Sequence, residues 1–395
     1  MIALLIIYLI CIVLIGYSYV VYPALLRVLS GGKKFSHEQF TQHESLPDVI
    51  IFFAVYNGEK VLREKLQSML QSDYPAQQIK ILVGSDESTD QTDAIVNEFA
   101  QVDHRVELHR FSRRGKANVL NSLSEILQKR PLKNDTIFIL TDAYAIFEPQ
   151  TVFELVKHFK SDEIGIVGAK YINTNVQEGG ISIQEKAYIQ RENLMKYHES
   201  VVFGSMMGVY GACYAIRAVD YPQFPTNILM EDFYVTMLTL LNNKKSILSL
   251  DAKFYESIPN SMDIEYNRKR RIAAGNFQNL FHFPSLLSPL RFKVAFPYWS
   301  HKVIRWMGPL LLFASYVCIL LLPFYSTAYW VIGLLAIHLF VLFIPMLDFV
   351  SKKVELDIAL LRYANYFLQM NVAVASGFLW FVRGIKTNVW QPTAR

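Results

Sequence analysis

Residues 79–90 read IKILVGSDESTD, an apolar run that ends in acidic and hydroxyl side chains. Two further acidic groups follow apolar stretches: TDAY at residues 141–144 and MED at residues 230–232. An open α/β sheet places its ligand site at the carboxyl ends of its parallel strands. Carboxylates gathered at such an edge suit a hard divalent cation and a phosphate-bearing ligand. The three groups therefore predict a phosphate site at one edge of a sheet.

The region around these groups has the pattern of an α/β domain, because apolar runs alternate with amphipathic helical stretches. Residues 49–55 form an unbroken apolar run of the kind that a buried parallel strand needs. The same pattern predicts further strands over residues 79–84, 106–111, 137–140 and 164–169, and helices over residues 116–127 and 183–199. We expect one α/β domain over residues 45–282.

The amino-terminal end of the chain is apolar enough to cross a bilayer. Residues 2–21 carry no charge, and a spanning helix needs about 20 apolar residues. A signal peptide would have a basic leader and a small-residue cleavage site, and this stretch has neither. We therefore expect a transmembrane helix over residues 1–30. Arg27, Lys33 and Lys34 follow the apolar run, so the positive-inside rule predicts a cytoplasmic α/β domain.

The carboxyl-terminal part predicts about three more transmembrane helices within residues 307–385, over residues 307–322, 329–347 and 363–382. The last of them leaves Arg383 and Lys386 on the outer side, so it either spans against the charge bias, or lies in the interface or re-enters the membrane. Residues 283–306 mix aromatic and basic side chains, which favours an amphipathic stretch on the membrane surface or an ordinary linker helix. With a tail at residues 386–395, the pattern is that of a multi-pass protein of the inner membrane.

The composition disfavours several other classes of protein. The chain has 395 residues, 52% of them hydrophobic, and a net charge of +5. No dense basic run stands beside a known fold signature, so nucleic acid is not an expected partner. Cys11, Cys213 and Cys318 lie far apart, so we expect buried thiols rather than disulfides or a metal site. His301 and His338 have no carboxylates beside them in the sequence and are expected to be structural.

Six motifs in order resemble those of family 2 glycosyltransferases, over roughly residues 45–285. Two of them are the acidic groups TDAY at residues 141–144, in the place of the family's D-x-D, and MED at residues 230–232, which resembles its ED motif. The others, with the family pattern in parentheses, are VYNGE at 55–59 (PAYNE), VGSDESTDQT at 83–92 (VSDGSTDGT), RGKAN at 114–118 (GKAxALN) and GVYGACYAIR at 208–217 (GaxGAlyAiRr).

The resemblance implies a GT-A-like domain, a Rossmann-like fold for nucleotide sugars, inserted between transmembrane helices. It implies that Asp142 binds a divalent cation, Mg²⁺ or Mn²⁺, and that Asp232 is the general base with Glu231 beside it. The remaining implied site residues bind the nucleotide sugar (Tyr56, Asn57, Asp86, Lys116, Arg268 and Arg271) or lie on the acceptor side (Gly208, Tyr210 and Gly211).

A single general base suits an inverting transfer. The acceptor hydroxyl attacks the anomeric carbon opposite the leaving nucleotide, so one carboxylate takes its proton and no protein nucleophile is needed. Structural alternatives exist for each group. Glu231 and Asp232 could be acids that a helix dipole favours, Asp86 could be a helix N-cap, and Lys116 could lie in a solvated turn. Asp90 is expected to be a cap or loop-bonding residue.

The chain departs from the family pattern at two motifs. Tyr144 stands where D-x-D has its second acid, so Asp142 alone would hold the ion, with water and phosphates completing the shell. Residues 268–272, RKRRI, lie where processive members carry Q-x-x-R-W; Arg271 keeps the arginine, whereas the glutamine and tryptophan are lost. This basic cluster could also contact anionic lipid headgroups.

These observations predict a membrane-bound inverting glycosyltransferase that moves a sugar from a UDP-type donor to a lipid-linked or growing polysaccharide acceptor, by one or many transfers. The alternative is a catalytically degenerate subunit of a polysaccharide synthesis or export complex, which Tyr144 favours and the intact Glu231–Asp232 pair opposes. The expected partners are the nucleotide sugar, the glycan or lipid-linked acceptor, the lipid bilayer and, for the alternative, subunits of an export complex.

Overall fold

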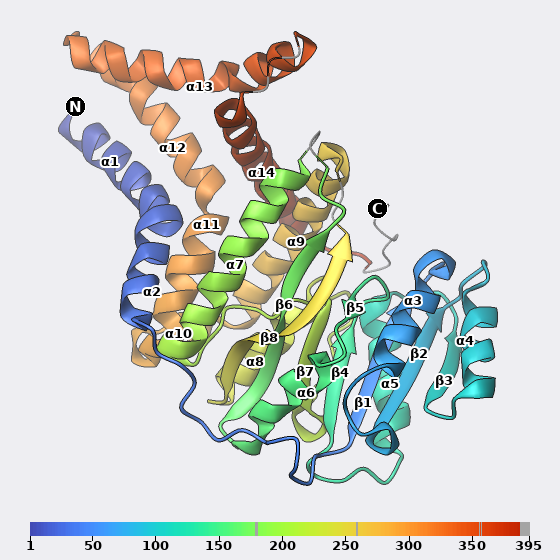
Figure 1. Cartoon of the computed structure of the whole chain (residues 1–395). Helices are drawn as coiled ribbons and strands as arrows, with labels where there is room; N and C mark the ends of the chain where they lie inside the picture. Colours follow the sequence, from blue (N-terminus) through green and yellow to red (C-terminus); the bar gives the residue numbers. More distant parts are fainter. Residues whose placement is uncertain (178–180, 258–259, 355, 357, 388–395) are drawn as a thin grey trace.

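The computed structural model describes residues 1–177, 181–257, 260–354, 356 and 358–387. Its centre is a mixed sheet of eight strands in the order β3-β2-β1-β4-β7-β6-β8-β5 (Figure 1). The strands are β1 Val49–Val55, β2 Ile79–Asp86, β3 Val106–Phe111, β4 Ile137–Thr141, β5 Ile146–Phe147, β6 Ile164–Thr174, β7 Cys213–Arg217 and β8 Lys245–Ser257. The sheet lies at one end of the molecule, and the most apolar helices lie at the other (Figure 1).

The predicted strands of the amino-terminal half form the parallel part of this sheet. β1 pairs in parallel with both β2 and β4, and β2 pairs in parallel with β3. Parallel strands end at the same edge of a sheet, so Tyr56, Asp86 and Asp142 follow or end neighbouring strands at one edge. The expected relation between acidic groups and strand ends is therefore observed for the first two groups.

The sequence pattern did not predict three of the strands, β5, β7 and β8, and the antiparallel pairings of β7 and β5 make the sheet mixed. β7 runs antiparallel between β4 and β6, whereas β8 runs parallel to β6. β7 has only five residues and is almost completely buried, so no alternation of polar and apolar positions marks it. β8 has thirteen residues, but serine, aspartate and lysine side chains interrupt its apolar positions. The local sequence pattern therefore does not identify β7 or β8, and both strands depend on packing against other segments.

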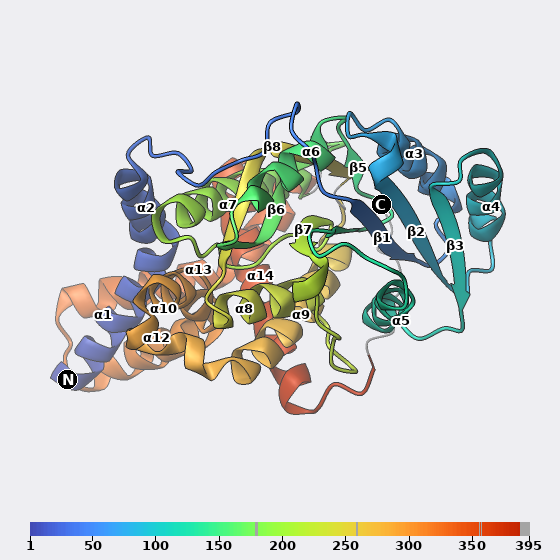
Figure 2. The same ribbon diagram turned by 90° about the horizontal axis from the view of Figure 1, so that it is seen from below.

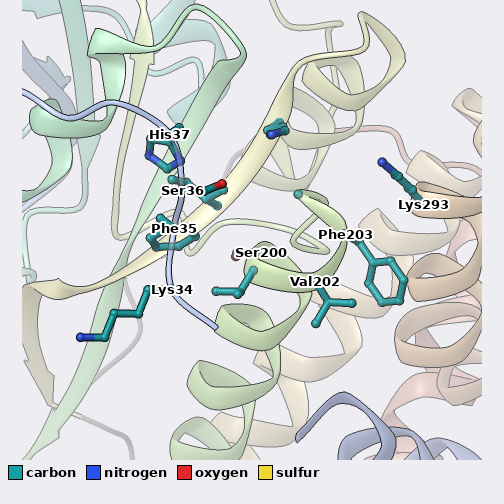
Figure 3. Close-up of a pocket in the computed structure, with 12 residues that line it drawn as sticks. Lys34, Phe35, Ser36, His37, Ser200, Val202, Phe203 and Lys293 are labelled. Atoms are coloured by element: carbon teal, nitrogen blue, oxygen red, sulfur yellow. The ribbon is translucent and has the colours of Figure 1, made fainter. Parts of the chain in front are cut away.

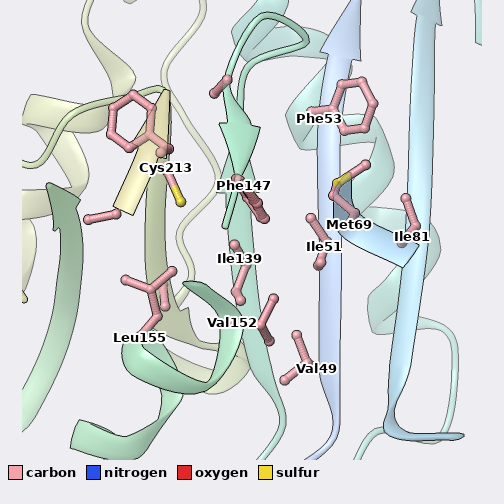
Figure 4. Close-up of a cluster of buried hydrophobic side chains, with 14 of the residues drawn as sticks. Val49, Ile51, Phe53, Met69, Ile81, Ile139, Phe147, Val152, Leu155 and Cys213 are labelled. Carbon is pink, nitrogen blue, oxygen red and sulfur yellow. The ribbon is translucent and has the colours of Figure 1, made fainter. Parts of the chain in front are cut away.

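The core consists of two layers, one on each face of the sheet. Residues of β1 alternate between them: Ile51 and Phe53 join the layer in Figure 4, and Phe52 joins the other. Helices α3, α4 and α6 cover the first face, and α5 and α8 cover the second (Figure 2). Full burial of each such large side chain contributes about 1.5–3 kcal/mol. The bounds of the helices around the sheet are α3 Glu59–Leu70, α4 Thr92–Val102, α5 Lys116–Gln128, α6 Thr151–Val156, α7 Ser182–Phe203, α8 Glu231–Leu241 and α9 Met262–His282.

The apolar helices form the second part of the molecule. They are α1 Ile2–Gly16 and α2 Tyr22–Ser30, joined by a π-helical turn, and α10 Phe292–Pro297, α11 Ile304–Trp306, α12 Gly308–Leu321, α13 Tyr329–Lys353 and α14 Ala359–Val382. Within the described residues, two helices are long and apolar enough to cross a bilayer, Ile2–Ser30 and Tyr329–Ser351. The pair Pro289–Trp306 and Gly308–Phe324 qualifies as a third only when taken together, with a bend of 59°.

Helix α14 contains the predicted span over residues 363–382, and it packs along α9. A methyl group at Gly377 would lie 2.5 Å from the Arg270 carbonyl oxygen and 2.6 Å from the Ala273 Cβ. The two helices therefore approach each other at small residues. Because α14 is not among the helices that meet the length and hydropathy criteria, three carboxyl-terminal spans remain a prediction.

The stretch over residues 283–306 has two different faces, as expected of an amphipathic segment. Leu286 and Tyr298 are completely buried against the domain. Leu290 and Phe292, in contrast, are 97% and 59% exposed. The outward apolar side chains are suited to a membrane surface, which stays a prediction.

Candidate active site

One cavity of about 1040 Å³ opens at the carboxyl ends of the parallel strands and extends to the amino-terminal helix. Ten of the twelve predicted site residues line it: Tyr56, Lys116, Asp142, Gly208, Tyr210, Gly211, Glu231, Asp232, Arg268 and Arg271. Asp86 and Asn57 are not among the lining residues. The residues come from the loops that follow β1 and β4, from α5, α8 and α9, and from the loop before β7, so the fold brings positions far apart in the chain into one cleft.

An ammonium group between two carboxylates lines this cavity. Lys116, the first residue of α5, places Nζ 2.7 Å from Asp142 Oδ1 and 2.6 Å from Glu231 Oε1. Burial by itself would lower the pKa of Lys116, but the charges of Asp142 and Glu231 raise it above its usual value. Lys116 therefore remains a cation, and it is not the solvated turn residue of the alternative interpretation.

Asp232 is held in place by two backbone amides. The Gly211 N–H donates to Oδ2 at 2.9 Å, and the Phe233 N–H donates to Oδ1 at 2.8 Å. Asp232 lies in the first turn of α8 and is 8% exposed. Burial, followed by the charge of Glu231, raises its pKa to about 6. A carboxylate with this affinity for a proton, facing a cavity, is suited to general-base chemistry near neutral pH.

The two predicted acceptor-side glycines lie against the residues around the base. A Cβ at Gly208, where φ is +87°, would lie 2.7 Å from the Phe233 ring. A Cβ at Gly211 would lie 3.0 Å from Asp232 Oδ2. The glycines thus allow this loop to approach the start of α8, and both also line the cavity. Between them, Tyr210 faces the cavity.

The contact between Gly211 and Asp232 predicts an effect on catalysis by a single methyl group. In Gly211→Ala the new Cβ would displace the Asp232 carboxylate by a few tenths of an ångström or more. Because small misplacements of a catalytic group are costly, we expect kcat to fall about 10- to 100-fold with little change in the donor KM. Gly333→Ala, with nothing within 4 Å of its Cβ, is the matched control. Steady-state kinetics would contradict this role if both variants kept the wild-type kcat.

Asp86 ends β2 and is bound by the loop that precedes α5. It accepts the N–H groups of Arg114 at 2.7 Å and Gly115 at 3.0 Å, and it pairs with the Arg113 guanidinium. The same guanidinium lies over the Tyr56 ring, 3.6 Å from its centroid. Asp86 therefore does not cap α4, and it fixes the loop that carries Lys116.

The loop after β1 is fastened to the loop after β2. Asn57 has a positive φ of 51°, and its Oδ1 accepts the Thr89 N–H at 2.8 Å. Asp90 accepts the N–H groups of Glu59 at 3.1 Å and Thr92 at 3.0 Å. Asp90 thus bonds the loop as expected. Asn57 is similarly engaged, which accounts for its position outside the cavity lining.

The basic cluster on α9 points mainly into the protein. Arg268 pairs with the fully buried Glu265 at 3.1 Å, and Lys269 pairs with Glu185 at 3.1 Å. Arg271 lines the cavity and lies 3.4 Å from the Leu229 carbonyl oxygen. These partners favour a structural and ligand-facing role over contact with lipid headgroups.

Several buried charges near the cavity were missed by sequence reasoning, because isolated lysines and glutamates in helices carry no motif. Lys65 of α3 donates to Thr141 Oγ1 at 2.8 Å and to the Ala145 carbonyl, so it supports the turn that contains Asp142. Lys196 of α7 has its Nζ 3.5 Å from the centroid of the Tyr210 ring. Both lysines are buried, and both line or underlie the predicted site.

The sequence interpretation of His301 was wrong about its surroundings. His301 is completely buried, with Nδ1 2.7 Å from Glu199 Oε1 and Nε2 3.1 Å from Glu192. Glu199 also accepts the Tyr22 hydroxyl at 3.0 Å, and Glu192 pairs with Arg305 at 2.8 Å. The carboxylates come from α7, more than 100 positions away in the chain, so a local view of the sequence could not find them. The network joins the amino-terminal helix to α7.

Asp142 fits a divalent cation that is bound together with a diphosphate. Its side chain is 34% exposed and lies in the cavity, so one carboxylate is accessible while water and phosphate oxygens could complete the shell. Tyr144, in place of a second acid, also lines the cavity. Within the described part of the chain, no group of three or more His, Cys, Asp or Glu residues is arranged to hold a metal. The site therefore suits an ion delivered with its substrate.

A smaller cavity of about 120 Å³ lies between the segment after α2, the end of α7 and β8 (Figure 3). Lys34, Phe203 and Lys293 are among its lining residues. It contains none of the predicted site residues, and it is separate from the larger cavity described above.

The three cysteines are buried and unpaired, as expected.

The fold and this carboxylate-lined cavity define a GT-A-type nucleotide-sugar domain. The structure is similar to that of the mannosyltransferase PcManGT from Pyrobaculum calidifontis in complex with GDP-Man and Mn²⁺, with a TM-score of 0.68 over 95% of this chain and 99% of that chain. The two sequences are 18% identical, so the likeness concerns the fold. The family profile "Glycosyl transferase family 2" matches residues 50–220, and "Glycosyl transferase family group 2" matches residues 137–347, more than half of the chain. The chain belongs to glycosyltransferase family 2.

Curated relatives show the same family likeness over part of their length. Glycosyltransferase GlyA of Streptococcus pneumoniae is 27% identical over 217 residues, 52% of this chain. A beta-monoglucosyldiacylglycerol synthase of a Nostoc species is 27% identical over 142 residues, 36% of this chain. The matches span about 30% of the length of either relative.

Proposed function

We propose that this protein transfers a sugar from a nucleoside diphosphate donor of the UDP type to an acceptor hydroxyl at a membrane, with inversion at the anomeric carbon. The observation that carries the proposal is the convergence of three groups in one cavity: the buried carboxylate Asp232, the accessible carboxylate Asp142 and the cation Lys116. Together they offer a base for the acceptor and opposite charges for a cation-bound diphosphate.

Asp232 is the proposed base in this reaction. Its carboxylate accepts the proton of the acceptor hydroxyl as that oxygen attacks the anomeric carbon. The two backbone amides at 2.9 and 2.8 Å hold the carboxylate in one orientation, which leaves the side chain little to reorganise at the moment of reaction. Glu231 pairs with Lys116 instead, so the two adjacent acids have separate roles.

The leaving diphosphate is the proposed ligand of Lys116 and Arg271. Both side chains line the cavity, and Lys116 lies at the amino-terminal end of α5, where unpaired backbone N–H groups also favour an anion. Asp142 would hold the divalent cation, which supplies neutralisation of the negative charge that develops on the leaving group when it is bound. The two side chains and the divalent cation would thus offset the negative charge of the diphosphate before and after the sugar departs.

The nucleobase is proposed to bind between Tyr56 and Asp86. In the structure the Arg113 guanidinium lies over the Tyr56 ring and pairs with Asp86. A guanidinium is a planar group with N–H donors, and a pyrimidine base shares both properties. The base would therefore replace Arg113 at this place, which would bring Asp86 into contact with the donor although it does not line the cavity in the structure.

The apolar helices and the extent of the cavity support a membrane location. The cavity reaches Tyr19, Val20, Pro23 and Ala24, which belong to the helix over residues 2–30. An acceptor with an apolar part could thus enter between this helix and the domain. We propose a multi-pass protein of the inner membrane, with the family 2 domain in the cytoplasm and a lipid-linked or polysaccharide acceptor.

Release of nucleotide from a panel of donors tests the activity. Purified protein in detergent is mixed with UDP- and GDP-sugars, with Mn²⁺, Mg²⁺ or EDTA, and free nucleoside diphosphate is measured. We expect release from at least one UDP-sugar, which divalent cations increase and EDTA abolishes. Absence of release and of nucleotide binding with every donor would overturn the proposed activity, and release from GDP-sugars alone would correct the donor.

A further inference from the structure

Lys196 is a buried cation for which the described part of the structure supplies no carboxylate within ion-pair distance. It is 4% exposed, and its Nζ lies 3.5 Å from the centroid of the Tyr210 ring. Two other lysines in the same cavity have carboxylate partners: Lys116 pairs with Asp142 and Glu231, and Lys302 pairs with Glu192 at 3.2 Å. An ammonium group that is buried without a carboxylate partner is costly, so a bound anion would stabilise the charged form of this side chain.

The surroundings of Lys196 support an anion as that ligand. Burial, followed by the nearby charge of Lys302, lowers its pKa to about 7, against the opposing effects of Glu192, Asp232 and Glu199. A bound anion would offset the loss of hydration and favour the charged form. The Tyr210 hydroxyl is also buried without a hydrogen-bond partner in the described structure. The Tyr210 side chain thus combines a hydroxyl without a hydrogen-bond partner and a ring that contacts the Lys196 ammonium group.

The position of Lys196 within the cavity indicates which substrate would bring the anion. Lys196 and Asp232 line the same cavity, and each affects the pKa of the other. Lys116 and Asp142 mark the donor end. Beyond Lys196 the cavity continues along α7 to Val20 and Pro23 on the amino-terminal helix. A group that binds Lys196 thus lies on the side away from the diphosphate, toward the membrane helix.

We propose that Lys196, together with Tyr210, binds an anionic group, such as a phosphate, carried by the acceptor. The proposal rests on the proposed function, because it assumes that Asp232 faces the acceptor. The ammonium group would pair with the anion, and the Tyr210 hydroxyl would donate a hydrogen bond to it. This contact would hold the attacking hydroxyl near Asp232, so Lys196 is a positioning residue that selects charged acceptors over neutral ones.

Binding of simple anions and amphiphiles tests the proposal without knowledge of the natural acceptor. The protein in detergent is titrated with dodecyl phosphate, inorganic phosphate and the neutral dodecyl glucoside, and Kd is measured by the thermal shift. The variants are Lys196→Met, Lys196→Arg and, as a control, Lys133→Met, whose side chain is 67% exposed. We expect Lys196→Met to weaken dodecyl phosphate binding about 10- to 100-fold, as loss of a charged hydrogen bond does. The Lys196→Arg and Lys133→Met variants should retain it.

The arms of the experiment separate the possible sources of the anion and the possible failures. Tight binding of dodecyl phosphate with weak binding of inorganic phosphate indicates a lipid-borne anion, and equal affinities indicate a soluble one; both support an anionic acceptor group. The proposal is overturned if Lys196→Met and the wild type have equal affinities for both phosphates. It is also overturned if the wild type binds dodecyl glucoside as tightly as dodecyl phosphate. Nucleoside diphosphate binding is measured in the same samples. Its retention in Lys196→Met shows a folded donor site, whereas its absence in the wild type counts against the proposed function instead.

Discussion

Asp232→Asn is expected to lower kcat for sugar transfer by about 10²- to 10⁴-fold, the range that general-base catalysis supplies. Asparagine is nearly isosteric, and its single amide oxygen can still accept one of the two N–H groups, from Gly211 or Phe233, that now bind different oxygens of the carboxylate. The fold and the affinity for the donor should therefore change little, while the ability to take a proton is lost. Transfer of radiolabelled sugar, with separate measurement of nucleotide binding, checks both parts.

The pH dependence of the wild type provides a second readout of the same group. The pKa of Asp232 is raised to about 6 by burial and by the charge of Glu231, so the carboxylate is protonated and inactive as the pH falls through this value. We expect kcat/KM to decrease about tenfold per pH unit below pH 6 and to be level above it, until another group titrates. The control for Asp232→Asn is Asp162→Asn, because the Asp162 side chain is 97% exposed. If Asp232→Asn keeps near-wild-type transfer, Asp232 is not the base.

Asp142→Asn is expected to reduce kcat/KM by about 100-fold and to raise the Mn²⁺ concentration needed for half-maximal activity. Asparagine keeps one oxygen ligand but loses the charge that attracts the cation, and removal of one electrostatic contact to a developing charge typically costs about 10²–10³ in rate. The Lys116 ammonium also loses one of its two carboxylate partners. The charge of Lys116 would then be less well compensated, so the enzyme would release the nucleoside diphosphate product more slowly.

A metal titration distinguishes these effects of Asp142. Asp251→Asn, with a side chain that is 76% exposed, is the matched control. Activity is followed over a range of Mn²⁺ at saturating donor. An unchanged Mn²⁺ requirement in Asp142→Asn would show that this carboxylate does not hold the ion, even if the rate falls.

The parallel half of the fold was predictable because short-range patterns specify it. Continuous apolar runs such as residues 49–55 mark doubly covered strands, and their ends carry the acidic motifs. β7 was not predictable by the same argument, because it is only five residues long and four of them are buried without a distinctive run. Its antiparallel direction depends on pairing with β4 and β6, which are distant in the chain.

The same distinction applies to the site. Motifs indicated Asp142, Lys116 and Asp232, and the structure places all three along one cavity. Lys196 and His301 had no motif around them, and their environments depend on contacts between α7 and other segments. The motif placed the glycines at 208 and 211 on the acceptor side, and only the structure shows how closely they approach α8. Local sequence patterns therefore could not reveal which charged side chains pair with each other, or which segments pack closely together in the site.

Direct displacement by an acceptor hydroxyl, with Asp232 as the only base, is tested most directly by the anomeric configuration of the first product. The wild-type enzyme is incubated with an α-linked nucleotide sugar and the acceptor it uses, and the product is examined by proton NMR before any equilibration. We predict a β-linked product, because a single displacement inverts the anomeric carbon. An α-linked product would contradict this mechanism, since retention requires a second displacement that one base cannot provide.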